Sequence, residues 1–202
     1  VDPGHFHAAL VQKNMYPQLN PEVFVYAPKS PDVDDHLDRI KGFNTRAENP
    51  TAWKTTTYRG DDFLEKAMAE KKGNVVMLAG NNRKKIETIK TFVDAGVNVY
   101  SDKPMCINKA GFEVLQEAFA SAKKNNVLLY DIMTERYEIT TMLQKELANT
   151  PAIFGALKKG TPEDPSVVKE SVHHFFKYVS GNPLKRPGWF YDTTQQGEGI
   201  VD

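Results

Sequence analysis

Residues 78–105 read "LAGNNRKKIETIKTFVDAGVNVYSDKPM", and this stretch decides the fold of the chain. Residues 78–80 are the end of an apolar run, Asn74–Gly80, which has the β-rich composition of a buried strand. Apolar side chains then recur at helical spacing, and Gly96 follows where a helix C-cap belongs. A second apolar run, Val97–Ser101, ends the stretch. Strand, helix and strand in this order predict a βαβ unit with parallel strands.

The same alternation continues on both sides of this unit. Glu22–Pro28 ("EVFVYAP") and Val127–Met133 ("VLLYDIM") are nearly continuous in hydrophobicity, as a parallel strand covered on both faces requires. Gly73 is a second C-cap candidate. Three helices are predicted from apolar faces made by Phe63, Leu64, Ala67 and Met68; by Ile86, Ile89 and Val93; and by Phe112, Leu115, Ala118, Phe119 and Ala122. We therefore predict an α/β fold with a doubly wound parallel sheet and a ligand crevice at the strands' carboxyl ends.

The pattern changes after Asn149. Residues 1–150 form the predicted dinucleotide-binding domain, and residues 151–202 the start of a second, α+β domain. Within the latter, Ile153–Gly160 is a strand candidate. The chain starts without an initiator Met and stops without a polar tail, so we expect a fragment whose first strand and last domain are incomplete.

The composition is that of a globular protein, with 40% hydrophobic and 26% charged residues. Acidic and basic residues balance at 26 each, which argues against nucleic acid or an anionic membrane as partner. No apolar run approaches the roughly 20 residues of a membrane span. A single cysteine, Cys106, excludes an internal disulfide framework. Localisation stays open, with the cytoplasm as the default and an exported form as the alternative.

The N-terminal "VDPGHFHAAL" fits the frame of a G-x-G-x-x-G phosphate loop in which only one glycine is present. Gly4 stands at the second position, where a missing side chain lets the backbone approach a pyrophosphate. A helix beginning near His7 would offer its first amides to the same group. The alternative is an ordinary turn at Pro3-Gly4.

Five motifs then follow one another in the order of a known family. Asn81-Asn82, Asp94-Ala95-Gly96 and Asp102-Lys103-Pro104 are similar to its P-N-x-x-H, A-G-K-H-V and E-K-P. Arg136-Tyr137 matches an Arg-aromatic pair that ends a strand, and "WFYDTTQQGEGIVD" is similar to W-R-x-D…G-G-G-x-x-x-D. Over essentially its whole length the chain resembles the Gfo/Idh/MocA family of nicotinamide-dependent oxidoreductases. The resemblance implies a Rossmann domain that binds NAD or NADP.

The resemblance also implies roles for individual residues. Lys103 and Asp202 are the expected catalytic residues, and the histidine that would pair with Asp202 falls beyond residue 202. The expected cofactor-binding residues are Gly4, His5, Phe6, Ala79, Asn81, Asn82, Asp102, Lys103 and Pro104. The expected substrate-binding residues are Arg136, His173, His174 and Trp189. Phe6 has the alternative role of a core anchor. No metal site is expected, since the adjacent His173 and His174 would face opposite sides of a strand and no third ligand is evident.

Several positions depart from the family pattern. Asp2 and His7 replace loop glycines, Asp102 replaces a glutamate, Lys85 replaces a histidine and Asn81 replaces a proline. Lys29 and Ser30 stand where a carboxylate usually meets the adenosine ribose. These two residues would meet a 2′-phosphate or face solvent, which leaves NAD and NADP both open. The family resemblance also favours a cis peptide bond between Lys103 and Pro104.

The expected reaction is hydride transfer to or from a hydroxyl-bearing carbon of a sugar, cyclitol or related polyol. One alternative is a relative that cleaves or epimerises glycosides while recycling its cofactor. Another is a non-catalytic protein that binds nucleotides or sugars. We expect a sugar-like small molecule as the substrate and a homo-oligomer formed through the C-terminal domain; the substrate's identity is beyond the sequence.

Overall fold

The computed structural model of the protein describes residues 1–133, 137–156, 158–168, 178–179 and 182–197. The chain divides into two compact units. One consists of Val1–Ile132 with Phe176–Asp202, and the other is Met133–Phe175. Pro151 lies inside the second unit, and the domain boundary expected near it stays a prediction.

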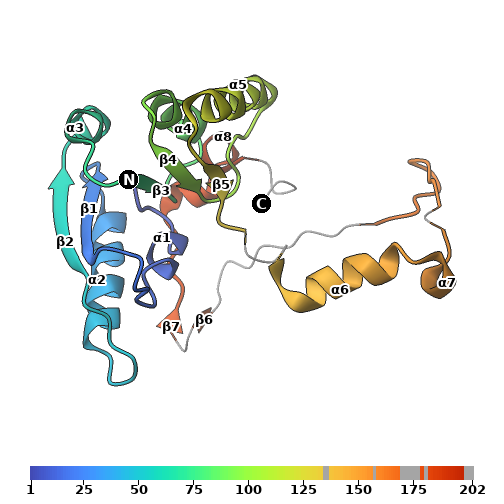
Figure 1. The fold of residues 1–202 in the computed structure, drawn as a ribbon, viewed down its shortest axis with the longest axis horizontal. Coiled ribbons are helices and arrows are strands. Elements are labelled where there is room, and N and C mark those ends of the chain that lie inside the picture. The colour runs from blue at the N-terminus through green and yellow to red at the C-terminus, as the bar shows by residue number, and fades with distance from the viewer. Residues whose placement is uncertain (134–136, 157, 169–177, 180–181, 198–202) are drawn as a thin grey trace. The chain divides into compact units, whose positions relative to one another are not determined.

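The first unit alternates strands and helices along most of its length (Figure 1). Its elements are α1 (His7–Leu10), β1 (Glu22–Ala27), α2 (Pro31–Thr45), β2 (Lys54–Arg59), α3 (Phe63–Glu70), β3 (Val75–Leu78), α4 (Lys85–Asp94), β4 (Asn98–Ser101), α5 (Lys109–Asn125) and β5 (Leu129–Asp131), followed later by β6 (Tyr178–Val179), β7 (Asn182–Pro183), the 3-10 helix η2 (Gly188–Tyr191) and α8 (Thr193–Gln196). The four strands expected from apolar runs are β1, β3, β4 and β5, so these predictions are confirmed.

Strands β1 to β5 are parallel and lie in the order of a doubly wound fold, whereas the short β6 and β7 pair antiparallel. β1 pairs with β2, and β3–β4–β5 form a second parallel set. Val1 and Asp2 lie between the two sets: the Val1 amino group donates to the Met77 carbonyl (2.8 Å), and the Asp2 amide to the Tyr26 carbonyl (2.9 Å). The order is therefore β2–β1–residues 1–2–β3–β4–β5, which confirms the predicted α/β fold class.

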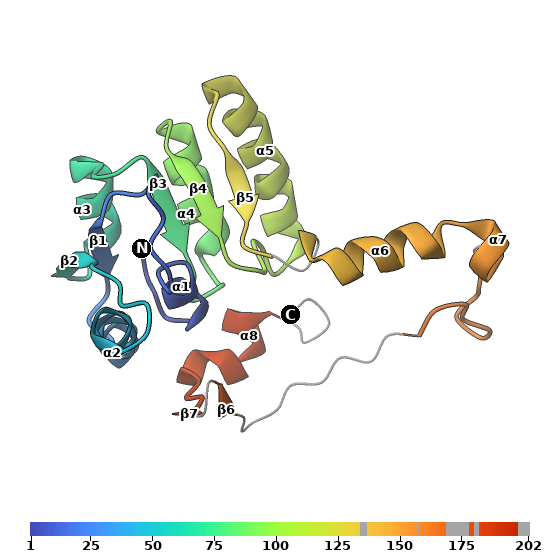
Figure 2. The same ribbon diagram turned by 60° about the horizontal axis from the view of Figure 1, so that its bottom comes forward.

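Helices cover both faces of these strands (Figures 1 and 2). α1 and α2 lie on one side, and α3, α4 and α5 on the other. The main core lies between strands β3, β4 and β5 and helices α4 and α5. Here Ile89, Phe92 and Val93 of α4 are buried beside Val99 of β4 and Ala118 of α5. This core holds the carboxyl ends of β3 and β4 in fixed positions.

Two details of the predicted helices need correction. Phe112 and Phe119 of α5 are 52% and 48% exposed, and the side of the helix that is buried carries small residues, Gly111, Ala118 and Ala122. α4 packs closely against α5, and close helix packing favours small side chains at the contact.

Gly96 adopts a positive φ of 76° after α4, as predicted. At the end of α3, Lys71 takes the left-handed position and Gly73 follows two residues later.

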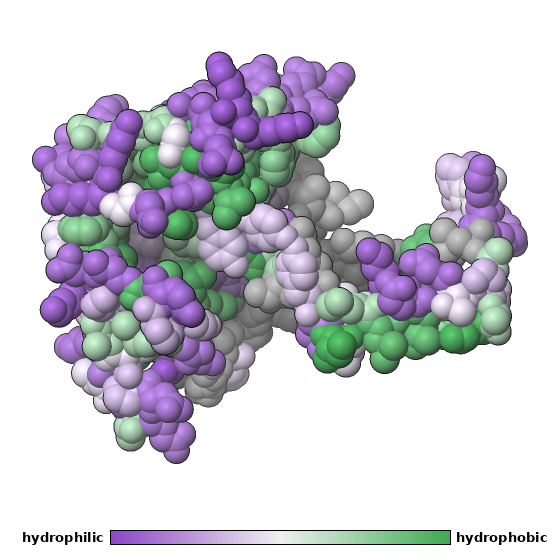
Figure 3. Space-filling view, viewed as in Figure 1, coloured by the Kyte–Doolittle hydropathy of each residue, from purple (hydrophilic) through white to green (hydrophobic). Residues whose placement is uncertain are grey.

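The second unit contains α6 (Ile139–Ala148) and α7 (Pro151–Phe154). The strand expected at Ile153–Gly160 is wrong at its start, because Pro151 opens a helical turn that contains Ile153 and Phe154. α6 carries an exposed apolar row of Ile139, Met142 and Leu143, visible in Figure 3. Among the described residues, no helix combines the length and the hydrophobicity needed to cross a membrane.

Candidate functional site

Three loops meet at the carboxyl ends of the central strands. They are the N-terminal loop (residues 2–7), the turn after β3 (residues 79–83) and the segment after β4 (residues 102–104). The His5 amide donates to the Ala79 carbonyl (2.7 Å), and the Asp102 amide donates to the Leu78 carbonyl (2.7 Å). Backbone hydrogen bonds thus fix the loops against one another, and most of the residues expected to bind the cofactor lie here.

Asp2 occupies the place of the first loop glycine, and it does so in the left-handed region, at φ 48°. Its carbonyl accepts from the Gly4 amide (2.9 Å), and its Oδ2 accepts from the Asn81 amide (3.3 Å). A Cβ added to Gly80 would lie only 2.2 Å from the Asp2 carbonyl oxygen and Oδ2. Gly80 therefore provides the close approach that lets an aspartate stand at this position. Burial raises the pKa of the Asp2 carboxyl.

Gly4 is not required by contacts within the protein. A Cβ added there would come no closer than 3.5 Å, to Asp32 Oδ2 and Trp189 Nε1, which is ordinary van der Waals distance. A Cβ would therefore fit beside Gly4. A glycine at this position is consistent with a bound ligand as well as with a turn.

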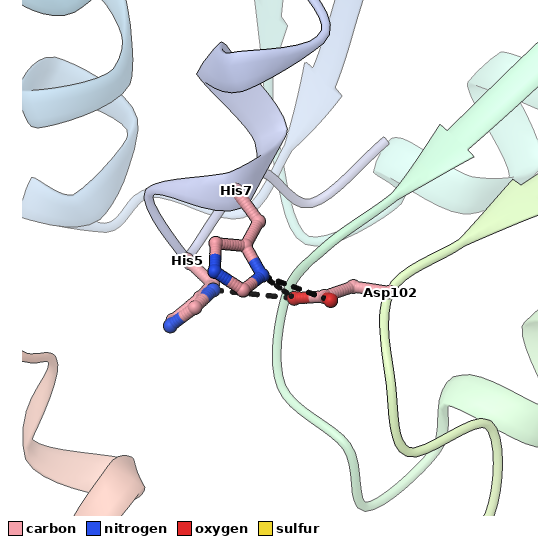
Figure 4. Close-up of side chains that lie close together, drawn as sticks. All are labelled: His5, His7 and Asp102. Atoms are coloured by element: carbon pink, nitrogen blue, oxygen red, sulfur yellow. Dashed lines mark hydrogen bonds and ion pairs between the residues drawn. The ribbon is translucent and has the colours of Figure 1, made fainter. Parts of the chain in front are cut away.

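His5, His7 and Asp102 form a compact cluster (Figure 4). His7 Nδ1 lies 3.0 Å from Asp102 Oδ1 and 3.2 Å from Oδ2, both within hydrogen-bonding geometry. His5 Nδ1 lies 3.2 Å from Oδ2 but is not aligned for a hydrogen bond. Burial lowers the pKa of His5 to about 4, so this imidazole is neutral at pH 7. Burial also favours the neutral acid of Asp102, but the two imidazoles outweigh it and hold the pKa of this carboxyl below its ordinary value.

The His7–Asp102 contact links two of the departures from the family pattern. His7 begins α1 in place of the third loop glycine, and Asp102 stands in place of the E-K-P glutamate. The two residues are 95 positions apart, so no spacing rule could have predicted that they touch. The cluster was missed for this reason.

Lys85, at the position of the expected histidine, is a buried contact between two loops. It is 5% exposed, and its Nζ donates to Asn82 Oδ1 and to the Asp102 carbonyl (3.3 Å). Burial lowers the pKa of this ammonium to about 8. Lys85 therefore ties the turn after β3 to the end of β4.

Lys103 directly follows the cluster. Its amide donates to Asp102 Oδ1 (2.9 Å), and its peptide bond to Pro104 is cis, as predicted. The side chain is half-buried. Pro104 itself is buried, like Ala79 after β3.

Residues 182–197 pack onto two of these loops, the N-terminal loop and the turn after β3. Asn81 Nδ2 donates to Gln195 Oε1 (2.8 Å), and Asn82 Nδ2 donates to the carbonyl (2.9 Å) and Oε1 (3.0 Å) of Gln196. The Phe190 ring lies parallel to His5 with 6.4 Å between centroids. Sequence reasoning missed Gln195 and Gln196, although "TTQQ" lies inside the quoted motif, because it assigned roles only to the motif's named positions.

Of the remaining predicted site residues, two lie at the N-terminal loop and four lie outside the described residues. Phe6 lies just before α1 with its ring 4.6 Å from His5 and 4.5 Å from His7, centroid to centroid. Trp189 lies beside Gly4, within the segment that packs on the loop. Arg136, His173, His174 and Asp202 lie outside the described residues, and their roles stay predictions.

A hollow of about 300 Å³ opens beside the site. It lies between the end of β1, the start of α3 and the turn after β3, and its lining includes Pro28, Phe63, Asn81 and Arg83. Apolar walls with a few polar groups at the mouth are typical of ligand pockets.

Comparison with known proteins gives one family and several structures. Residues 143–202 match the family described as "Putative oxidoreductase C terminal domain". The structure of a "putative oxidoreductase" from Parabacteroides merdae is 65% identical over 100% of this chain, with a TM-score of 0.93. This chain spans 46% of that protein's length. No curated protein matches the chain.

Two remoter structures match part of the chain. The WlbA dehydrogenase from Bordetella pertussis, in complex with NADH and UDP-GlcNAcA, is 16% identical over 73% of this chain and 36% of its own, with a TM-score of 0.44. An oxidoreductase structure from Bacteroides fragilis is 16% identical over 72% of this chain and 37% of its own, with a TM-score of 0.45. Similarity at this level carries no argument about function.

Proposed function

We propose that this chain is part of a Gfo/Idh/MocA-type oxidoreductase that uses NAD or NADP. Its reaction would be the oxidation or reduction of a hydroxyl-bearing carbon in a sugar, cyclitol or related polyol. The observation that carries the proposal is the meeting of Gly4, Asn81 and Lys103 at the carboxyl ends of adjacent parallel strands. Ligands of doubly wound folds bind at this edge. The 65% identical structure described as an oxidoreductase supports the same class of activity.

The residues at this edge fit a dinucleotide. The space beside Gly4 admits a close backbone approach, and the hollow lined by Pro28 and Asn81 suits an adenosine. The amides of Gly4, His5, Ala8 and Ala9 donate to carbonyls of the protein, so a pyrophosphate would rely on the amides of Phe6 and His7.

The choice between NAD and NADP would depend on few residues. Ser30 caps α2, with its Oγ accepting from the Asp32 amide (3.3 Å). Of the two residues expected near the ribose, Lys29 is thus the better candidate for contact with a 2′-phosphate.

Lys103 would serve the reacting carbon–oxygen group. A bound nicotinamide supplies the site of hydride exchange. The Lys103 ammonium would donate to the substrate oxygen and stabilise it as negative charge develops. Asp202 would orient the general base that takes the hydroxyl proton, a role in which a histidine is expected.

Replacing Lys103 tests the proposal in the full-length protein. Lys103→Met keeps most of the apolar stem and removes the charge. We expect turnover to fall by about a hundredfold or more, as for other oxyanion-stabilising groups, while the NAD(P) dissociation constant and Tm change little. Lys109→Met, at an exposed position on α5, is the matched control and should retain full turnover.

Turnover and dissociation constants would be measured by nicotinamide absorbance and fluorescence over a panel of sugars and cyclitols. Full activity of the Lys103 variant would reject its catalytic role. Product formation without net change in absorbance would indicate the cofactor-recycling alternative. The absence of both NAD(P) binding and product would leave a non-catalytic protein.

A further inference from the structure

We propose that His5, His7 and Asp102 form a binding site for one divalent transition-metal ion. The proposal goes beyond the oxidoreductase assignment and does not depend on it. Two imidazole nitrogens and a carboxylate oxygen, all within 4.8 Å of one another, are brought together by the N-terminal loop, α1 and the end of β4 (Figure 4). Among the described residues, this group of side chains lies close enough to share an ion.

The distances suit a single ion. Asp102 Oδ2 lies 3.2 Å from His5 Nδ1 and 3.2 Å from His7 Nδ1, so it faces both imidazoles equally. Zinc ligands lie about 2.0–2.2 Å from the metal, which places two tetrahedral ligands about 3.4 Å apart. Both nitrogen–oxygen separations are close to this value.

The ligand types specify the class of ion. Imidazole with one carboxylate suits zinc, iron, cobalt or nickel, whereas calcium and magnesium prefer oxygen ligands alone. Three protein ligands leave a fourth position for water or another small ligand, as in metal sites that act on a bound molecule.

The cluster is prepared for coordination in two ways. The Lys103 amide donates to Asp102 Oδ1 (2.9 Å) and so fixes the orientation of the carboxylate, whose two oxygens both lie near His7 Nδ1. Such outer contacts commonly orient metal ligands. His5 Nδ1 is buried without a hydrogen-bond partner, and coordination would satisfy it. Each imidazole would carry its proton on Nε2 when Nδ1 binds the ion.

Nearby charges do not fill the site. The ammonium of Lys85 donates its hydrogen bond to the backbone carbonyl of Asp102 (3.3 Å) and interacts with the carboxylate electrostatically. The Asp2 carboxylate interacts electrostatically with Lys85 and partly offsets its charge. The carboxylate of Asp102 thus stays available to a cation.

Direct metal binding tests the proposal without any enzymatic readout. Tag-free full-length protein is freed of metal with a chelator and titrated with Zn²⁺ by calorimetry and with Co²⁺ by visible absorption. We expect one equivalent to bind, with a Co²⁺ spectrum of nitrogen and oxygen ligands in a tetrahedral field. His7→Gln and Asp102→Asn should each weaken binding by at least about tenfold.

The control is a His173→Gln/His174→Gln double variant, which keeps the cluster and should bind as the wild type does. The proposal is overturned if wild-type protein binds no equivalent of either ion, or if only the double variant loses binding. If a cluster variant fails to fold, the Co²⁺ spectrum and stoichiometry of the wild type decide alone. NAD(P) binding is measured separately, so failure of the metal site and failure of the oxidoreductase proposal remain distinguishable.

Discussion

At the scale of single residues, the departures from the glycine-rich pattern compensate one another. Asp2 replaces a glycine and adopts a positive φ, and Gly80 on the neighbouring turn supplies the missing space. His7 replaces a second glycine, and the short Asp102 accepts its hydrogen bond. The sequence identified each of these positions only as a departure from the family pattern. Their spatial pairing could not be predicted, because it joins residues far apart in the chain.

Gly4 offers the sharpest test of the loop. We predict that Gly4→Val abolishes NAD(P) binding while Tm falls by only a few degrees, because the space beside Gly4 admits a Cβ without a short contact. Fluorescence titration and thermal unfolding measure the two effects. Gly42→Ala, on α2 with nothing within 4 Å of the added Cβ, should leave binding unchanged. Undiminished affinity in the Gly4 variant would remove the pyrophosphate from this loop.

At the scale of elements, hydrophobic pattern predicted the buried strands and missed the elements with a polar sequence. β2 reads "KTTTYR" and pairs only with β1 at the edge, so its composition lacks the continuous apolar run of a central strand. α2 buries just Val33, His36 and Ile40 in fifteen residues. The sequence feature that indicates α2 more clearly than its few apolar residues is Ser30-Pro31, because the serine caps the helix and the proline begins it.

His36 of α2 should make stability depend on pH. It is 6% exposed with Nδ1 unpartnered, and burial lowers its pKa to about 4. The unfolded chain, with a histidine pKa of about 6.5, therefore binds the proton more tightly than the folded protein. Stability is fully present above pH 6.5 and declines as the pH falls toward 4, by ~3 kcal/mol from this group.

Denaturant unfolding between pH 4 and 7.5 measures this dependence. His36→Leu, which removes the titrating group, should flatten the decline over that window relative to the wild type. Equal slopes in the two proteins would mean that His36 does not contribute.

At the scale of the whole molecule, the site depends on segments from both ends of the first unit. Asn82, in the turn after β3, is 3% exposed and donates to Gln196, 114 residues further along the chain. Its Oδ1 also accepts from the buried Lys85. One amide thus joins the turn after β3, the start of α4 and α8. The sequence predicted Asn82 as a cofactor contact, and its structural use shows why motif position alone does not assign a role.

We predict that Asn82→Leu destabilises the protein by about 2–4 kcal/mol, because it leaves the ammonium of Lys85 and the polar groups of Gln196 buried without this partner. Gln195→Ala, which removes the half-buried bonds of this side chain to Asn81 and Asp192, should cost about 1 kcal/mol. Denaturant unfolding gives both values, and hydrogen exchange should show faster exchange in residues 188–196 of the Asn82 variant alone. A double-mutant cycle with Gln196→Leu should give a coupling of at least about 1 kcal/mol. Additive effects would mean that residues 182–197 are held on the strand ends by other contacts, and that the Asn82–Gln196 pair does not keep the two segments together.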